Sequence, residues 1–187
     1  MNPMRDRLKA GKTVVGTAGS VFEDNMVMLA DSGLDFILFD TQHSPIEPKE
    51  YKRSFDAIKG KSATPIMRVS ANRPELICFA LDLGARGIIV PMVNTKEEAT
   101  AMVRACQYSP LGDRSNAGVR GEWGDFGDSN YREYLDTVNE ELLIIPMIET
   151  QQAIDNIDEI LSVPGIDVLL IGPSDLSIEL NVPLDYP

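Results

Sequence analysis

The fold is decided by the stretch Leu142–Ser177, which reads LLIIPMIETQQAIDNIDEILSVPGIDVLLIGPSDLS. Two apolar runs enclose one helical pattern, an order typical of parallel strands joined by a crossover helix. Glu149 follows the first run and Asp175 follows the second. Functional groups of parallel α/β proteins collect where strands end, so we expect both carboxylates to face the same space. Such oxygen ligands favour Mg²⁺ or Mn²⁺ over zinc or copper.

The rest of the chain repeats this alternation of strand and helix. No linker or change of composition interrupts it, so we expect one α/β domain over residues 1–187. The turn expected after the first strand, GTAGS, lacks the G-x-G-x-x-G pattern, which favours a TIM (β/α)8 barrel over a dinucleotide-binding sheet. The six predicted strands lie near Val14, Phe36, Ile66, Ile88, Ile144 and Leu169.

Six strands are fewer than the eight that close such a barrel. A complete barrel typically spans about 250 residues, whereas this chain has 187. A barrel closes only when its last strand pairs with its first. We therefore expect a barrel truncated after about six strands, whose first and sixth strands flank a gap. The natural polypeptide would continue for roughly 60 residues that supply strands seven and eight.

The composition argues against several kinds of partner. Seventeen Lys and Arg against 29 Asp and Glu give a net charge of -12, which repels nucleic acids and anionic membranes. No apolar run approaches the roughly 18 residues of a membrane span, and the N-terminal residues lack a signal-peptide core. Cys78 and Cys106 lie in apolar helical patterns and are expected to be buried, reduced thiols. These features predict a cytoplasmic protein.

One connection is longer than the others. Residues 108–130 are rich in Gly, Ser, Asn and Asp, and they include the single tryptophan, Trp123. Loops of this length are usually lids or binding loops. We therefore expect this segment to contribute to the choice of substrate.

Polar side chains also fall where the second and third strands should end. His43, the only histidine, lies three residues after Asp40. A nearby carboxylate can orient an imidazole and raise its basicity, although the histidine could equally be a solvated surface residue. Arg68 interrupts an apolar strand. Its planar donors suit a substrate carboxylate or a developing oxyanion, and the alternative is a buried ion pair with a neighbouring acid.

The acids have structural alternatives as well. Glu149 could simply begin a helix, and Asp175 could cap the short helix that SDLS predicts. The segment Gly172–Asp175 also offers backbone N–H groups to a substrate carboxylate beside the proposed metal. Asp82, near the end of a helical stretch, is either a surface charge or a functional acid.

Together these motifs resemble the HpcH/HpaI aldolases, which are metal-dependent (class II) 2-oxo acid aldolases. The resemblance covers most of the chain, from about Gly33 to Ser177, in the family's order. It implies a (β/α)8 barrel of the phosphoenolpyruvate/pyruvate-binding type. The matching pieces are LADSGLDFILFDTQHSP, the Arg68 strand, LDLGARGIIVPMVNTKEEA, YSPLGDRS, IPMIET and GIDVLLIGPSDLS.

The resemblance implies reversible cleavage of a 4-hydroxy-2-oxo acid to pyruvate and an aldehyde through a metal-stabilised enolate. Glu149 and Asp175 would bind the divalent ion, which would be Mg²⁺, Mn²⁺ or Co²⁺. His43, oriented by Asp40, would take the proton from the 4-hydroxyl group during cleavage and return it during condensation.

Substrate binding is implied at the same edge of the barrel. Arg68 would hold the substrate near its oxo group and stabilise the enolate oxygen. The backbone at Ser174 and Asp175 would receive the substrate carboxylate. Asp82 would approach the site of a neighbouring subunit, so the resemblance also implies a homo-oligomer.

Two positions depart from the family's usual pattern. Gln42 stands where the family commonly has a glutamate, and Met147 stands where it often has a glutamine. Both changes bear on substrate choice and leave the metal pair intact. Two alternatives stay open: a lyase that acts on a CoA ester, as in the citrate-lyase-like barrels, and a non-catalytic barrel that binds an oxo acid.

Overall fold

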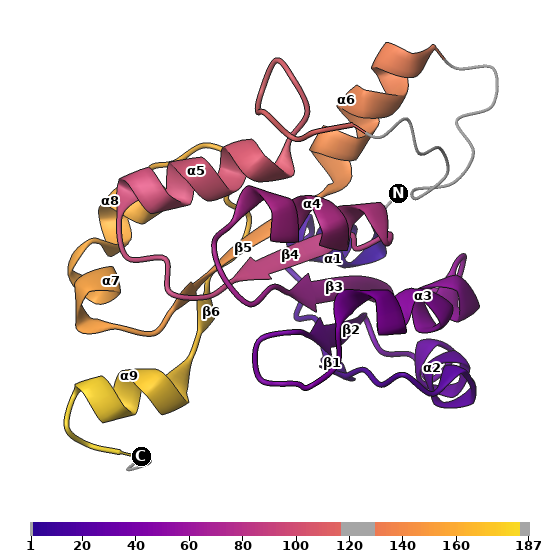
Figure 1. Ribbon diagram of the computed structural model, residues 1–187, viewed down its shortest axis with the longest axis horizontal. Helices are drawn as coiled ribbons and strands as arrows, with labels where there is room; N and C mark the ends of the chain where they lie inside the picture. The colour runs from indigo at the N-terminus through magenta and orange to yellow at the C-terminus, as the bar shows by residue number, and fades with distance from the viewer. Residues whose placement is uncertain (1, 117–129, 184–187) are drawn as a thin grey trace.

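The computed structural model describes residues 2–116 and 130–183, and its strands form one curled parallel sheet (Figure 1). Each strand pairs with the next one in the sequence, giving the order β1-β2-β3-β4-β5-β6. This order is the winding of a (β/α) barrel. The strands are β1 (Gly16–Ala18), β2 (Phe36–Asp40), β3 (Thr64–Arg68), β4 (Gly87–Val90), β5 (Leu143–Ile148) and β6 (Leu170–Ile171).

Helices lie between the strands and return the chain to the start of the next one. The clearest sequence pattern is confirmed in α5, where Thr95 and Glu98 form a capping box and the apolar stripe is buried. The helices are α1 (Pro3–Lys9), α2 (Glu23–Ala30), η1 (Pro48–Tyr51, a 3-10 helix), α3 (Lys52–Ile58), α4 (Pro74–Asp82), α5 (Lys96–Cys106), α6 (Tyr131–Glu141), α7 (Gln151–Asp155), α8 (Ile157–Leu161) and α9 (Pro173–Glu179).

The sheet has an apolar layer on each face. One layer packs against the helices and includes Met67 and Ile144. The other lies on the inner face and includes Ile66, Ile145 and Met147. Side chains along a strand alternate between faces, so Arg68, two residues after Ile66, belongs to the inner face. The inner face therefore runs from an apolar base to polar residues at the strand ends.

The sheet is open, as expected. Strands β1 and β6 form its two edges, and within the described residues they do not pair with each other. Near these edges, large apolar side chains are exposed, with exposed fractions of 59% for Val15 and 50% for Ile171. In helix α9, Ile178 is 60% exposed. The described chain thus forms an open part of a barrel with two unpaired strand edges.

The segment after β5 departs from its sequence pattern. One helix was expected over residues 151–161, with Ile154 and Leu161 on its buried face. The structure instead breaks it at Asn156, and these side chains are 36% and 52% exposed. Asn156 adopts a non-helical conformation and donates from its side chain to the Asn94 carbonyl at 2.9 Å. This tertiary hydrogen bond outweighs the local helical periodicity.

The two cysteines differ in burial. Cys106 is buried, and burial raises the pKa of its thiol to about 12. Cys78 is only half-buried, so the expectation of burial holds for one cysteine.

No helix in residues 2–116 and 130–183 is long and apolar enough to cross a membrane. Trp123, with residues 117–129 of the predicted binding loop, lies outside the described residues.

Candidate active site

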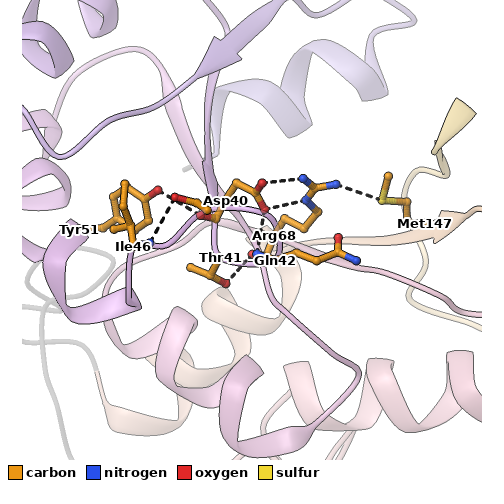
Figure 2. A network of polar contacts seen from close by, with 8 residues as sticks. Asp40, Thr41, Gln42, Ile46, Tyr51, Arg68 and Met147 are labelled. Atoms are coloured by element: carbon orange, nitrogen blue, oxygen red, sulfur yellow. Dashed lines mark hydrogen bonds and ion pairs between the residues drawn. The ribbon is translucent and has the colours of Figure 1, made fainter. Parts of the chain in front are cut away.

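The ends of β2 and β3 bring Asp40 and Arg68 together (Figure 2). The two residues are partners in the register of the strands. Arg68 donates from Nε to Asp40 Oδ1 at 2.8 Å and from Nη2 to Oδ2 at 2.6 Å. A two-point pair of this kind fixes the plane of the guanidinium group. The ion pair considered for Arg68 is therefore present, and Asp40 is its partner.

Asp40 accepts hydrogen bonds from the Arg68 guanidinium group rather than from the histidine ring. Its carboxylate also accepts from the backbone N–H groups of Gln42 and His43. Burial is the largest influence on the pKa of Asp40 and raises it, but these hydrogen bonds and the Arg68 charge together lower it. A carboxylate has about four acceptor positions, and these four N–H groups use them.

The expectation that Asp40 orients the His43 imidazole is therefore corrected. Within His43, it is the backbone N–H and not the imidazole ring that donates a hydrogen bond to Asp40. The His43 side chain is exposed on the loop that follows β2. The ring thus lies at the edge that carries the site, without the carboxylate partner that the sequence suggested.

The rest of the guanidinium group faces the inner side of the sheet. Arg68 Nη1 lies 3.9 Å from the Met147 sulfur, which is a weak acceptor (Figure 2). Hydrogen bonding to Asp40, the largest influence, raises the pKa of Arg68, and the negative charges of Glu149 and Asp175 add to this effect. These charges act on a cation whose orientation is fixed.

Glu149, directly after β5, is buried, with 1% of its surface exposed. Its Oε2 accepts from the backbone N–H of Met92 at 3.0 Å. Met92 follows β4 with a φ of 56°, a left-handed conformation that is uncommon for a residue other than glycine. Glu149 Oε1 is buried and has no hydrogen-bond partner among the described residues. A buried oxygen of this kind costs free energy unless a ligand satisfies it.

Gly172 lets the Glu149 side chain pack directly against the backbone at the end of β6. A Cβ atom at Gly172 would come within 2.6 Å of Glu149 Cγ and 2.7 Å of Glu149 Oε1. Real Cβ atoms do not approach so closely, so only glycine fits without a shift. The buried Oε1, an acceptor without a partner among the described residues, fits a divalent cation with oxygen ligands. Residues 2–116 and 130–183 contain no cluster of three or more His, Cys, Asp or Glu suited to a metal, so water or substrate would complete the coordination.

Asp175 is the candidate second carboxylate. It is exposed in the first turn of α9, and its charge contributes to the raised pKa of Arg68. The alternative role as a helix cap is not seen, because Gly172 is the N-cap and no side chain caps this helix. Ser174 is exposed in the same turn. Asp175 thus remains available for another role.

Asp82 is not brought to the site of its own chain. It ends α4, just before the turn into β4, and therefore lies at the opposite edge of the sheet from the strand ends (Figure 1). Its Oδ1 accepts from Arg114 Nη2 at 2.9 Å. Its predicted role in the site of a neighbouring subunit stays a prediction.

Two contributors were not predicted from sequence. Nothing in the sequence marks Met92 as a residue with positive φ. Gly172 was noted only for its backbone N–H groups, although a glycine next to a strand end is a usable signal for close approach. A third observation concerns Gln42, whose Oε1 is buried with no partner among the described residues.

The parallel, barrel-like sheet and the charged residues at its carboxyl edge define an enzyme of the (β/α)-barrel class. The chain belongs to the HpcH/HpaI aldolase/citrate lyase family, whose sequence pattern matches residues 22–185. This confirms the family inferred from the motifs. Relatives at about 34% identity are named as aldolases.

Two curated relatives and one solved structure illustrate the similarity. The chain is 34% identical over 186 residues to the 2-keto-3-deoxy-L-rhamnonate aldolase of Escherichia coli K12, covering 97% of this chain and 68% of the relative. It is 35% identical over 182 residues to the hydroxypyruvate/pyruvate aldolase of Roseobacter denitrificans, covering 97% and 70%. The crystal structure of an HpcH/HpaI aldolase from Desulfitobacterium hafniense matches with a TM-score of 0.89 at 30% identity, covering 98% and 71%.

Proposed function

We propose that this protein is a divalent-metal-dependent aldolase that reversibly cleaves a 4-hydroxy-2-oxo acid to pyruvate and an aldehyde. One observation carries the proposal: Arg68, whose orientation Asp40 fixes, lies at the same edge of the sheet as the buried Glu149 Oε1 that has no partner among the described residues. A fixed cationic donor and a cation-binding carboxylate pair are what enolate formation needs. The aldolase names of the relatives support the same reaction type.

Glu149 and Asp175 would hold the ion. Glu149 supplies the buried Oε1 that has no partner among the described residues, and Asp175 supplies an exposed carboxylate. Oxygen ligands of this kind suit Mg²⁺, Mn²⁺ or Co²⁺. When bound, the ion would polarise the oxo group of the substrate and stabilise negative charge on its oxygen.

Arg68 would donate to the same oxygen as negative charge develops on it. Nε and Nη2 are held by Asp40, which leaves Nη1, beside the Met147 sulfur, as the nitrogen that faces a ligand. The ion pair fixes its direction before the substrate arrives. Such preorganisation is what makes an oxyanion donor effective.

His43 would be the acid–base group. Its ring is exposed on the loop after β2, where it can exchange protons with the substrate hydroxyl group or a bridging water. It would take the proton of the 4-hydroxyl group in cleavage and return it in condensation. The backbone at Ser174 and Asp175 would receive the substrate carboxylate. Asp82 would act only toward a neighbouring chain, in a homo-oligomer.

The proposal is tested by measuring pyruvate release from a panel of 4-hydroxy-2-oxo acids, with and without added Mn²⁺. Metal-dependent release supports it. Release from a CoA ester instead would favour the citrate-lyase-like alternative. Binding of oxo acids without turnover would favour a non-catalytic barrel.

A further inference from the structure

Met147 connects the two halves of the candidate site. It lies in β5 on the inner face of the sheet, with 7% of its surface exposed. Its sulfur is 3.9 Å from Arg68 Nη1. Its Cε and Glu149 Oε1 each lie 2.7 Å from the point where a Cβ atom on Gly172 would be. The thioether therefore reaches from the guanidinium group to the carboxylate proposed to hold the metal.

Apart from these two charged groups, Met147 packs against apolar side chains. Met147 pairs in register with Leu170 of β6, and it shares the inner cluster with Ile89 and Ile145. A thioether has no donor and is only a weak acceptor. A ligand group that lies against the thioether itself therefore exchanges water for a surface that offers almost no hydrogen bonding.

The position of Met147 determines which carbon atom of a bound oxo acid would contact its side chain. In the proposed function, on which this inference rests, the oxo group lies between Arg68 and the ion at Glu149. A 2-oxo acid that joins these groups must cross the thioether. Its C3 atom, bonded to the oxo carbon, would then lie within van der Waals reach of Met147.

We infer that Met147 makes the site select pyruvate over hydroxypyruvate as the carbon nucleophile. The methyl group of pyruvate can lie against a thioether without giving up any hydrogen bond. The extra hydroxyl group of hydroxypyruvate gives up hydrogen bonds to water and finds no equal partner there. An apolar pocket rejects an added hydroxyl group by about 10²-fold at most, so we expect a preference of about 10- to 100-fold.

The test is exchange of the C3 protons of each oxo acid in D₂O with Mg²⁺, followed by NMR, which needs no aldehyde. The wild-type protein should exchange the C3 protons of pyruvate about 10- to 100-fold faster than those of hydroxypyruvate. Met147→Gln, which adds an amide, should bring the two rates within a few-fold. Met147→Leu, which keeps the apolar surface, should retain the preference. Calorimetric dissociation constants for the two oxo acids should show the same change.

Each outcome decides a different point. Equal wild-type rates, or an unchanged ratio in Met147→Gln, would overturn the role of Met147 and leave the aldolase proposal standing. No exchange of either acid with any divalent metal would overturn both. Thermal unfolding checks that the variants fold, and Met147→Thr is the substitute polar variant if Met147→Gln does not.

Discussion

Asp40 and Arg68 lie directly opposite each other at the ends of β2 and β3, with Oδ2 and Nη2 2.6 Å apart. The Thr41 hydroxyl group donates to the Arg68 carbonyl at 2.7 Å and the Tyr51 hydroxyl group to the Asp40 carbonyl at 3.1 Å. Strand register and these two hydrogen bonds therefore hold the ion pair in place (Figure 2). Asp40 is best described as a positioning residue for Arg68.

The first prediction concerns the shape of the Arg68 side chain. Arg68→Lys keeps the charge but loses the planar set of donors that spans Asp40 and the substrate. We expect turnover to fall by about 10²–10³, the usual effect of losing one oxyanion donor. Steady-state pyruvate release measures it, with thermal unfolding as the control for folding. Near-native turnover would mean that Arg68 is only a structural ion pair.

A second prediction follows from the lowered pKa of Asp40. A carboxyl group with a lowered folded-state pKa stabilises the protein above its unfolded value, about 3.9, and this contribution is lost as pH falls through the folded value. The difference in unfolding free energy between wild type and Asp40→Asn should be constant from about pH 5 to 8 and shrink below about pH 4. Urea unfolding across this range measures it. A difference that does not begin to shrink as the pH falls below the unfolded value would contradict the assignment.

Metal binding can be tested through stability as well as activity. A ligand that binds only the folded state stabilises it by about 2.7 kcal/mol at 100 times its dissociation constant. Mn²⁺ should therefore raise the melting temperature of the wild type but not that of Glu149→Gln. Glu159→Gln, the same change at an exposed acid in α8, should respond like the wild type. Full activity in excess chelator, or a lysine Schiff base trapped by borohydride, would argue decisively against a metal-dependent reaction.

Gly172→Ala tests the close approach of Glu149 to the backbone of Gly172. The backbone of Gly172 has a negative φ of -97°, so alanine meets no strain from the dihedral angle itself. Its Cβ atom would instead collide with Glu149 and displace the carboxylate. We expect Mn²⁺ affinity to fall by about 10- to 100-fold, as for other changes that disturb metal ligands from behind. Calorimetric titration measures it, and an unchanged affinity would place the ion elsewhere.

Gln42→Met tests whether an unpaired polar atom is kept for function. Gln42 Oε1 is buried without a partner among the described residues, and such an atom costs about 1–3 kcal/mol. The similarly shaped, apolar methionine should raise the unfolding free energy by about 1 kcal/mol. If Gln42 binds substrate, KM should rise at the same time. A loss of stability would mean that ordered water satisfies the oxygen in the native protein.

Some candidate site residues lie where the sequence pattern predicts, and others have partners that it does not predict. The pattern alone predicts that Glu149 and Asp175 follow strands, and in the structure they follow β5 and β6. The partner of Asp40 was misjudged, because His43 is three residues away in sequence whereas Arg68 is 28 residues away and adjacent in the sheet.

The sequence by itself determined the alternation of strand and helix, the parallel sheet and the positions of polar residues after apolar runs. These features follow from local periodicity, which each segment carries in its own residues. Only the tertiary structure decided that Arg68 takes both oxygens of Asp40 and that Met92 bends back to donate to Glu149. It also left Glu149 Oε1 without a partner among the described residues, beside Gly172. Such contacts join separate strands, and the register that creates them depends on packing across the whole sheet.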